Sequence, residues 1–151
     1  MTTDFGENWQ MMNLPDISQH TWFVYADQVD AGIVWAASVS QMLYKSSDSG
    51  NTWEECYLPP SNLGYWPQDI IHLQEYPEVV IAGTCVPPSV LISYDSGRTF
   101  EPFTEGLKYK TNFHELIADP NDNSIVYAAT IDGVKRLYYQ DVSVPDISLS
   151  L

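Results

Sequence analysis

The stretch SSDSGNTW at residues 46–53 indicates the class of fold, because related stretches recur on both sides of it. Residues 93–100 read SYDSGRTF, and residues 2–9 read TTDFGENW. All three have Ser or Thr, an Asp two positions later, a Gly after two more, then Thr or Asn, and finally an aromatic residue. The three aspartates are separated by 44 and 47 residues. Self-similarity at a period of this length is typical of a repeat architecture.

Each copy of the motif is predicted to form a tight turn that satisfies its own polar groups. The aspartate accepts hydrogen bonds from backbone amides of the turn, a common role of Asp at the start of a loop. The glycine supplies positive φ, and the aromatic ring covers the turn as an apolar plug. The residues assigned this structural role are Asp4, Gly6, Trp9, Asp48, Gly50, Thr52, Trp53, Asp95, Gly97, Thr99 and Phe100. No residue of the chain is assigned as catalytic.

Short runs of β-branched and aromatic residues surround the three turns. They are bounded by Pro, Gly, Asn and Asp, and none has the 3.6-residue period of a helix. The runs cover residues 21–27, 33–39, 42–46, 52–57, 69–75, 79–85, 90–93, 99–103, 113–119, 125–130 and 133–139. They group as four short strands per unit of about 45 residues, which is the pattern of a β-propeller blade. The sequence therefore predicts an all-β propeller of four-stranded antiparallel blades.

The turn between the third and fourth strands of each unit resembles the BNR or Asp-box repeat. That repeat occurs in sialidases, in xyloglucan-cleaving propellers, in sortilin-type receptors and in photosystem assembly factors. The resemblance covers residues 2–139 and is specific for the repeat class, not for one function. It implies a partial β-propeller, and it implies an extracellular or periplasmic location, which the residues themselves do not establish.

The strand count predicts about three blades' worth of chain, two complete blades and two partial ones. The expected boundaries are a fourth strand with its turn at 1–13, blades at 14–60 and 61–108, an incomplete blade at 109–141, and a tail or linker to a following module at 142–151. Propellers usually close with at least four blades, and repeat stacks do not leave their end sheets bare. The favoured interpretation is a fragment of a longer protein. The alternatives are a homodimer completing a six-blade propeller and an open three-blade wedge.

Charge and composition exclude several classes of partner. The chain of 151 residues has 20 acidic and 6 basic residues, for a formal net charge of −14. This excess of negative charge disfavours nucleic acid and anionic membrane surfaces as partners. No apolar run is long enough to span a bilayer, and the first 20 residues lack the pattern of a signal peptide. Cys56 and Cys85 make neither a disulfide framework nor a metal cluster, and whether they are bonded stays open.

No constellation of residues predicts a complete catalytic or metal site. The resemblance to sialidases implies three arginines around the substrate carboxylate, but this chain has only Arg98 and Arg136. Glycosidases need two carboxylates roughly 5 to 9 Å apart. Acids on or beside the first strands are the candidates: Asp27, Asp69, Glu75, Glu115 and Asp119. His20, His72 and His114 lie at non-equivalent positions of the repeat, so no metal and no cofactor are predicted.

Aromatic residues in the connections between blades are the candidate ligand-binding residues. Tyr65 and Trp66 lie in SNLGYWPQD (61–69), and Tyr109 lies in EGLKYKTN (105–112). Flat rings with polar edges stack on sugars and anchor peptides. Packing between blades is the alternative role for the same rings.

The predicted function is that of a non-catalytic binding or scaffold segment of a larger propeller protein, with a glycan or a protein as ligand. One alternative is part of a glycoside hydrolase, sialidase-like or xyloglucanase-like, whose catalytic residues lie partly outside this chain. A second alternative is an assembly-factor or receptor-like propeller that binds a protein partner. The acidic charge favours cationic or neutral ligands over sialylated ones.

Overall fold

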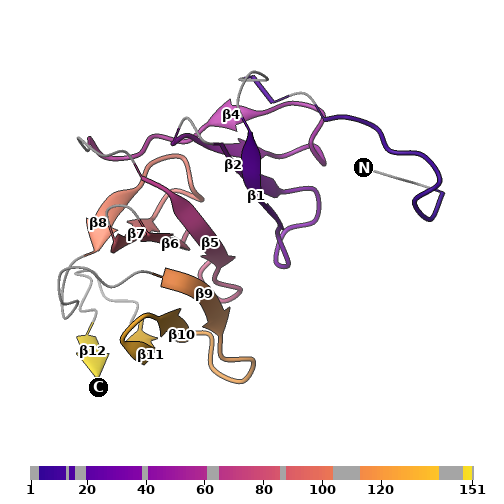
Figure 1. Ribbon diagram of the computed structural model, residues 1–151. Helices are drawn as coiled ribbons and strands as arrows, with labels where there is room; N and C mark the ends of the chain where they lie inside the picture. Colours follow the sequence, from indigo (N-terminus) through magenta and orange to yellow (C-terminus); the bar gives the residue numbers. More distant parts are fainter. Residues whose placement is uncertain are drawn as a thin grey trace.

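The computed structural model describes residues 4–12, 14–15, 20–38, 41–60, 65–85, 88–103, 113–139 and 148–150. Every element in these ranges is a β-strand, and the strands form three four-stranded antiparallel sheets (Figure 1). Within each sheet the strands follow one another in chain order, so each is paired with its sequence neighbour. This arrangement confirms the predicted all-β fold of four-stranded propeller blades.

The three sheets are called blade 1 (β1–β4), blade 2 (β5–β8) and blade 3 (β9–β12). Blade 1 consists of β1 (Thr21–Ala26), β2 (Val34–Ser38), β3 (Leu43–Ser46) and β4 (Glu54–Glu55). Blade 2 consists of β5 (Pro67–His72), β6 (Val80–Cys85), β7 (Pro88–Ser93) and β8 (Glu101–Phe103). Blade 3 consists of β9 (Phe113–Ala118), β10 (Ile125–Thr130), β11 (Gly133–Tyr138) and β12 (Ser148–Ser150).

The first strands of the blades line the inner side of the arrangement. β1 contacts β5, and β5 contacts β9, so these strands lie next to one another across the blade boundaries (Figure 1). Each first strand has an irregularity after its first residue, which makes Phe23, Asp69 and Glu115 equivalent in register. An acidic side chain therefore stands at the same inner position in two successive blades.

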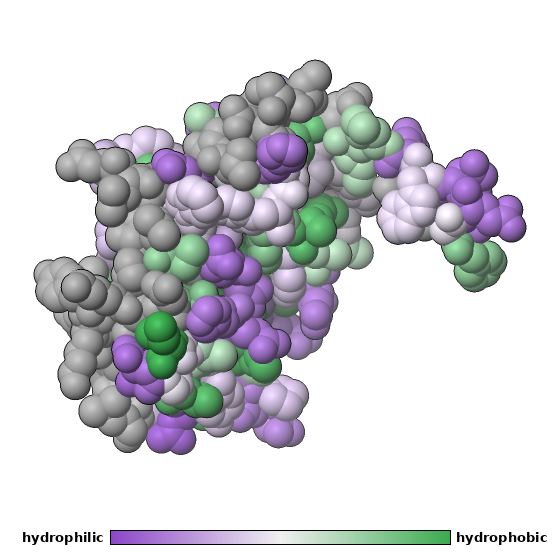
Figure 2. Space-filling view, in the orientation of Figure 1, coloured by the Kyte–Doolittle hydropathy of each residue, from purple (hydrophilic) through white to green (hydrophobic). Residues whose placement is uncertain are grey.

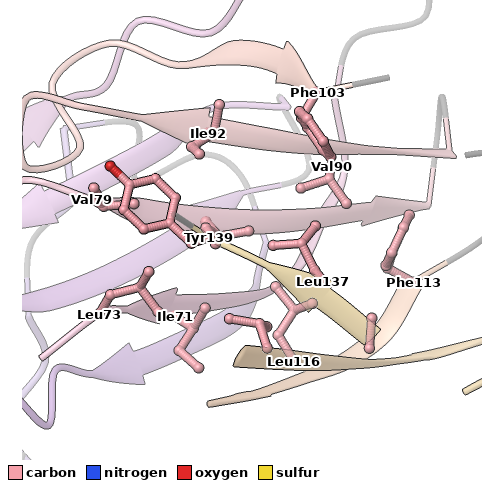
Figure 3. Packing of buried hydrophobic residues seen from close by; sticks show 13 residues of the cluster. Ile71, Leu73, Val79, Val90, Ile92, Phe103, Phe113, Leu116, Leu137 and Tyr139 are labelled. Atoms are coloured by element: carbon pink, nitrogen blue, oxygen red, sulfur yellow. The ribbon is translucent and has the colours of Figure 1, made fainter. Parts of the chain in front are cut away.

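Two apolar cores hold the blades together. The core between blades 1 and 2 includes Trp35 and Leu43 from blade 1 and Ile70, Val80 and Leu91 from blade 2. The core between blades 2 and 3 joins side chains of β5, β6 and β7 to those of β9, β10 and β11 (Figure 3). Its labelled members are Ile71, Leu73, Val79, Val90, Ile92, Phe103, Phe113, Leu116, Leu137 and Tyr139.

The burial patterns of the second strands, β2, β6 and β10, show which sheet faces are covered. β2 and β6 are buried along almost their whole length, as expected for central strands with both faces covered. β10 instead alternates between buried and half-buried residues, which is the pattern of a sheet covered on one face. Blade 3 therefore has one face in the core and one face turned away from it.

Two segments differ from the boundaries expected from the sequence. Residues 148–150, inside the predicted tail or linker at 142–151, form β12 and pair with β11. The physical reason is that a free strand edge presents unpaired backbone groups, which a short extended segment can satisfy. Residues 4–12 contain most of the first copy of the repeated motif and form no strand.

Candidate functional site

The repeated motifs form three turns with the same hydrogen bonds. We call them the first (Asp4–Trp9), second (Asp48–Trp53) and third (Asp95–Phe100) aspartate turns. Their glycines all have positive φ, between 83° and 93°, a region that side chains resist. The turns therefore depend on glycine for their shape.

The second aspartate turn shows how the carboxylate is used. The backbone N–H of Thr52 donates to Asp48 Oδ1 over 2.8 Å, and its hydroxyl donates to Oδ2 over 2.7 Å. The Ser46 hydroxyl also donates to Oδ1, over 2.8 Å. These hydrogen bonds, those from Thr52 first, hold the pKa of Asp48 below its usual value. Both carboxylate oxygens are thus occupied within the turn.

The other two aspartate turns repeat this arrangement. Thr99 donates to Asp95 through its N–H and its hydroxyl, over 2.8 and 2.7 Å. In the first turn, Asn8 donates to Asp4 through its backbone N–H and its side-chain amide, over 3.0 and 2.6 Å. The turn-closing hydrogen bonds come from residues four positions away, so these aspartates act locally and are poor candidates for catalysis.

Side chains from elsewhere in the chain cover two of the turn glycines. An added Cβ at Gly97 would lie 2.0 Å from the Trp35 ring, and one at Gly50 would lie 1.8 Å from Met12 Cε. Lys45 Nζ donates to the carbonyl of Ser96 over 2.7 Å and lies 5.2 Å from the centre of the Trp35 ring. The third aspartate turn is thus held against blade 1 by an aromatic ring and a cation. The only sequence signal for this contact is a Trp within an apolar strand, because Trp35 and Gly97 lie 62 positions apart.

A buried ion pair joins blade 1 to blade 2. His72 Nδ1 lies 2.9 Å from Asp27 Oδ2, and His72 Nε2 lies 2.7 Å from the carbonyl oxygen of Pro77. Both ring nitrogens therefore face acceptors, which only the doubly protonated imidazolium can satisfy. The Asp27 hydrogen bond is the main cause that raises the pKa of His72, against the opposing effect of burial.

The carboxylate of Asp27 has further donors in its own loop. Its Oδ1 accepts the N–H groups of Val29 and Asp30, and its Oδ2 also accepts the indole N–H of Trp35. Burial alone would raise the pKa of Asp27, but the hydrogen bonds, led by that of His72, lower it to about 2. Asp27 and His72 were separate candidates in the sequence. Their pairing was missed because it joins residues 45 positions apart, close to one repeat.

A cleft with a volume of about 520 Å³ runs along β5 and β9 and ends at the loop after β1. Its acidic lining residues are Asp69, Glu115 and Asp119, and His72 also faces it. Apolar side chains, among them Ile70 and Ile117, form the rest of its wall with neutral polar groups. None of the described residues that line it is Lys or Arg. The volume is typical of ligand sites, and the lining has a strong negative bias.

Asp69 lines this cleft and also links two blades. Its Oδ2 accepts the backbone N–H of Leu116 over 2.6 Å, and its Oδ1 accepts that of Ile70 over 2.9 Å. Burial raises the pKa of Asp69, the charge of Glu115 adds to the rise, and the two amide hydrogen bonds oppose it. The carboxyl group thus ties β5 to β9 while bordering the cleft. Glu75, the remaining acid predicted on these strands, is not among the cleft residues.

Tyr65 and Trp66, two of the three aromatic residues proposed as ligand-binding, lie at the opposite end of the first strands. Tyr65 is only 7% exposed and belongs to the core between blades 1 and 2, so its ring does not face solvent. Trp66 is half-buried and stacks on Trp22, with ring centres 4.3 Å apart. The indole of Trp22 in turn donates to the carbonyl of Pro67. Tyr109 lies outside the described residues.

Other candidate groups are placed as follows. His20 and His114 are exposed, far from the buried environment of His72. Cys56 and Cys85 are free thiols, and burial raises the pKa of Cys56 to about 12. Among the described residues, no cluster of three or more His, Cys, Asp or Glu side chains is arranged to hold a metal ion. That part of the chain also has no helix of the length and apolarity needed to cross a membrane.

No family model matches this chain, and no curated protein matches its sequence. Solved structures with the same fold do exist. An ancestral GH74 enzyme superposes with a TM-score of 0.65 at 16% identity, over 85% of this chain and 18% of the enzyme. The GH74 xyloglucanase from Xanthomonas campestris gives a TM-score of 0.58 at 13% identity, over 77% of this chain and 20% of that enzyme.

YCF48 is a third protein with this fold. The structure from Cyanidioschyzon merolae gives a TM-score of 0.60 at 18% identity, over 85% of this chain and 36% of YCF48. A structure of YCF48 bound to D1 peptide gives 0.55 at 16% identity, over 93% of this chain and 44% of that one. This chain thus spans less than half of each of these proteins. At such identities the likeness establishes a β-propeller fold and nothing finer.

Proposed function

We propose that this chain is a non-catalytic binding segment of a larger Asp-box β-propeller protein. Its ligand is a protein or peptide that presents Lys or Arg side chains to the cleft along β5 and β9. The observation that carries the proposal is the lining of this cleft, where Asp69, Glu115 and Asp119 meet apolar side chains and no described lining residue is Lys or Arg. His72 also lines the cleft, but its imidazole is already paired with Asp27.

The physical basis is electrostatic focusing in a partly enclosed site. A cleft lined by charges of one sign raises the local concentration of ligands of opposite sign and speeds their association. The net charge of −14 adds a long-range attraction for the same ligands. Ile117, which is 53% exposed, supplies apolar contact area for the aliphatic part of a Lys or Arg side chain. The peptide named with YCF48 is a precedent for peptide binding on this fold.

The test is a calorimetric titration with three peptides of equal length, rich in Lys, Gln or Glu. The Lys-rich peptide should bind at least about tenfold more tightly than the Gln-rich one, and the Glu-rich one should not bind. Glu115→Gln should weaken binding of the Lys-rich peptide several-fold. The matched control is Glu54→Gln, which removes an exposed acid of β4 outside the cleft. Equal loss of affinity in both variants would show only a non-specific effect of net charge and would contradict the proposal.

A glycoside hydrolase segment is the second candidate function. Its support is that Asp69, with a raised pKa, lies beside Glu115 in the same cleft, and glycosidases use such a protonated and ionised pair. The GH74 xyloglucanase is the structural precedent. This candidate predicts release of sugars from xyloglucan that Glu115→Gln abolishes and Glu54→Gln preserves. The hydrogen bonds of both Asp69 oxygens to backbone amides favour the binding function instead.

A further inference from the structure

Blade 3 has an outward face, made of the side chains of β9–β11 that point away from blade 2. The side chains that face the core shared with blade 2 are Leu116, Val126, Ala128 and Leu137. Because side chains alternate along a strand, their neighbours point outward, among them Ile117, Tyr127, Val134 and Arg136. Ile117 is 53% exposed and Val134 is 76% exposed. Hydrophobic residues, green in Figure 2, reach the surface among hydrophilic ones over the region of β9–β11.

Tyr127 holds the same position in blade 3 that Trp35 holds in blade 1. Each lies in the second strand and donates a hydrogen bond to the aspartate that follows the first strand. Tyr127 donates its hydroxyl to Asp119, and Trp35 donates its indole N–H to Asp27. The backbone N–H groups of the two aspartates also donate to equivalent carbonyls. These belong to Ile33 and Ile125, each two residues before the aromatic residue. In blade 1, this aromatic ring covers a turn glycine of the next blade.

The basic residue beside the ring is repeated as well. Trp35 is paired with Lys45 across β2 and β3, and Tyr127 is paired with Arg136 across β10 and β11. Lys45 donates to the third aspartate turn through Ser96. Arg136 is exposed and lies 4.7 Å from the ring of the outward-facing residue Tyr138. Blade 3 therefore presents outward the same aromatic and basic pair that blade 1 uses to hold an aspartate turn.

Blade 2 differs from blades 1 and 3 in the residues at these two positions. The corresponding pair in blade 2 is Ile81 and Ile92, and both belong to the core against blade 3. Blade 3 has no aspartate turn motif where one is due, since residues 141–148 read DVSVPDIS. Blade 1, which has the aromatic and basic pair, is therefore followed by a blade with an aspartate turn. Blade 2, which has the aliphatic pair, is followed by a blade without the motif of that turn. The outward face of blade 3 has an aromatic and basic pair like that of blade 1, so it is suited to contact an aspartate turn.

The first aspartate turn is the part of the chain that suits this face. It stands apart from the three sheets at the end of the N-terminal segment (Figure 1). Its apolar residues are turned to solvent, with Phe5 108% and Trp9 76% exposed. The atom nearest to an added Cβ at Gly6 is Trp9 Nε1 of the same turn, 3.9 Å away. At Gly50, by contrast, Met12 takes the place that such a partner ring would need.

We propose that the first aspartate turn of one copy docks on the outward face of blade 3 of a second copy, with Tyr127 over Gly6 and Arg136 beside the turn. Charge favours this pairing at Arg136, because the turn carries Asp4 and Glu7. The acid Glu115 also points outward, but it lies at the other end of the face, in register with Ala129 and Val134. Two copies that exchange their turns form a closed dimer with two identical contacts. This interface borders the acidic cleft at Ile117 and Asp119, but it does not depend on the function proposed for the cleft.

The test is the solution mass of the chain, measured by sedimentation equilibrium. The measurement uses protein at about 0.1 mM in about 0.15 M salt, where the screening length is about 8 Å. The expected mass is twice 17.1 kDa. Val134→Glu and Arg136→Glu should each weaken association at least about tenfold. Ile131→Glu is the matched control, because Ile131 is 66% exposed in the turn between β10 and β11 and lies outside the face.

A charge swap identifies the docking partner. Glu7→Arg combined with Arg136→Glu should restore association to within a few-fold of the native chain, because the attraction is rebuilt with opposite signs. Far-ultraviolet circular dichroism of each variant shows that the blades stay folded. A native chain that is monomeric at this concentration overturns the proposal. So does a dimer that Arg136→Glu leaves intact, or a weakened dimer that the added Glu7→Arg does not restore.

Discussion

The side chains of His72 and Asp27 meet over 2.9 Å at the boundary of two blades, and each belongs to a different one. The imidazole is satisfied on both nitrogens only when it is charged, and the carboxylate has three further donors. The pair therefore couples the protonation of one histidine to the contact between blades 1 and 2.

The first prediction concerns the pH dependence of stability. The pKa of His72 is raised in the folded chain, so its contribution is complete below its usual pKa of about 6.5 and is lost as the pH rises through the folded pKa. The pKa of Asp27 is lowered to about 2, so its contribution is complete above its usual value of about 4 and is lost as the pH falls toward 2. The free energy of unfolding should therefore be highest between about pH 4 and 6.5.

A single substitution tests the histidine part of this profile. His72→Gln should lower the free energy of unfolding at pH 6 by about 2 kcal/mol, because a charged buried hydrogen bond is lost. It should also remove the decline above pH 6.5 in denaturant titrations. The control is His114→Gln, which replaces an exposed histidine and should leave the profile unchanged. A decline that persists in the His72 variant would assign the pH dependence to another group.

The second prediction compares two glycines with positive φ. Gly97→Ala places a methyl group 2.0 Å from the Trp35 ring, whereas Gly133→Ala has nothing within 4 Å of its new Cβ. Both variants carry the backbone strain of a left-handed conformation, but only the first also forces blades 1 and 2 apart. Gly97→Ala should therefore cost about 1 to 3 kcal/mol more than Gly133→Ala in chemical denaturation. Equal losses would show that the Trp35 ring moves aside without cost.

The third prediction concerns the closure of the aspartate turns. Asp95→Ala removes the acceptor for the N–H and hydroxyl of Thr99 and for the hydroxyl of Ser93. The loss should be about 1 kcal/mol, because water replaces part of the hydrogen bonding at this largely exposed turn. Thr99→Val removes a single side-chain donor and should cost less. Thermal unfolding of the two variants in parallel checks this order, and the reverse order would contradict it.

The fourth prediction concerns Trp66. Its ring stacks on Trp22 across the boundary between blades 1 and 2, and such a pair contributes about 0.5 to 1.5 kcal/mol beyond its buried area. Trp66→Ala should therefore lower the free energy of unfolding. Titration with neutral oligosaccharides, followed by tryptophan fluorescence, tests its predicted ligand-binding role. Glycan affinity that is unchanged in the folded variant would leave Trp66 with the packing role alone.

The fold and the turns were predictable because their causes are local. Ser46, Asp48 and Thr52 lie within seven residues of one another, and the hydrogen bonds that close the turn join them directly. The strands were also predictable, since short apolar runs between Gly, Pro, Asn and Asp have few alternatives. The position of β12 was missed, because its pairing depends on the edge of β11 and not on its own three residues.

The candidate site could be predicted only in part. Asp69, Glu115 and Asp119 were identified as acids near the first strands, but their convergence on one cleft requires β5 and β9 to lie side by side. Tyr65 and Trp66 appeared to be equivalent loop aromatics. The structure separates them, because Tyr65 enters the core between blades and Trp66 stays half-buried on Trp22.

The repeat, the short strands and the aspartate turns follow from the amino-acid sequence, because the hydrogen bonds that close each turn join residues four positions apart and short apolar runs between turn residues form strands. The contacts between blades depend on the tertiary structure. Trp35 reaches Gly97, and Asp27 reaches His72, across separations of 62 and 45 residues. Such contacts exist only once the sheets are stacked, since burial in the shared core brings these side chains together and then makes their hydrogen bonds and charges strong.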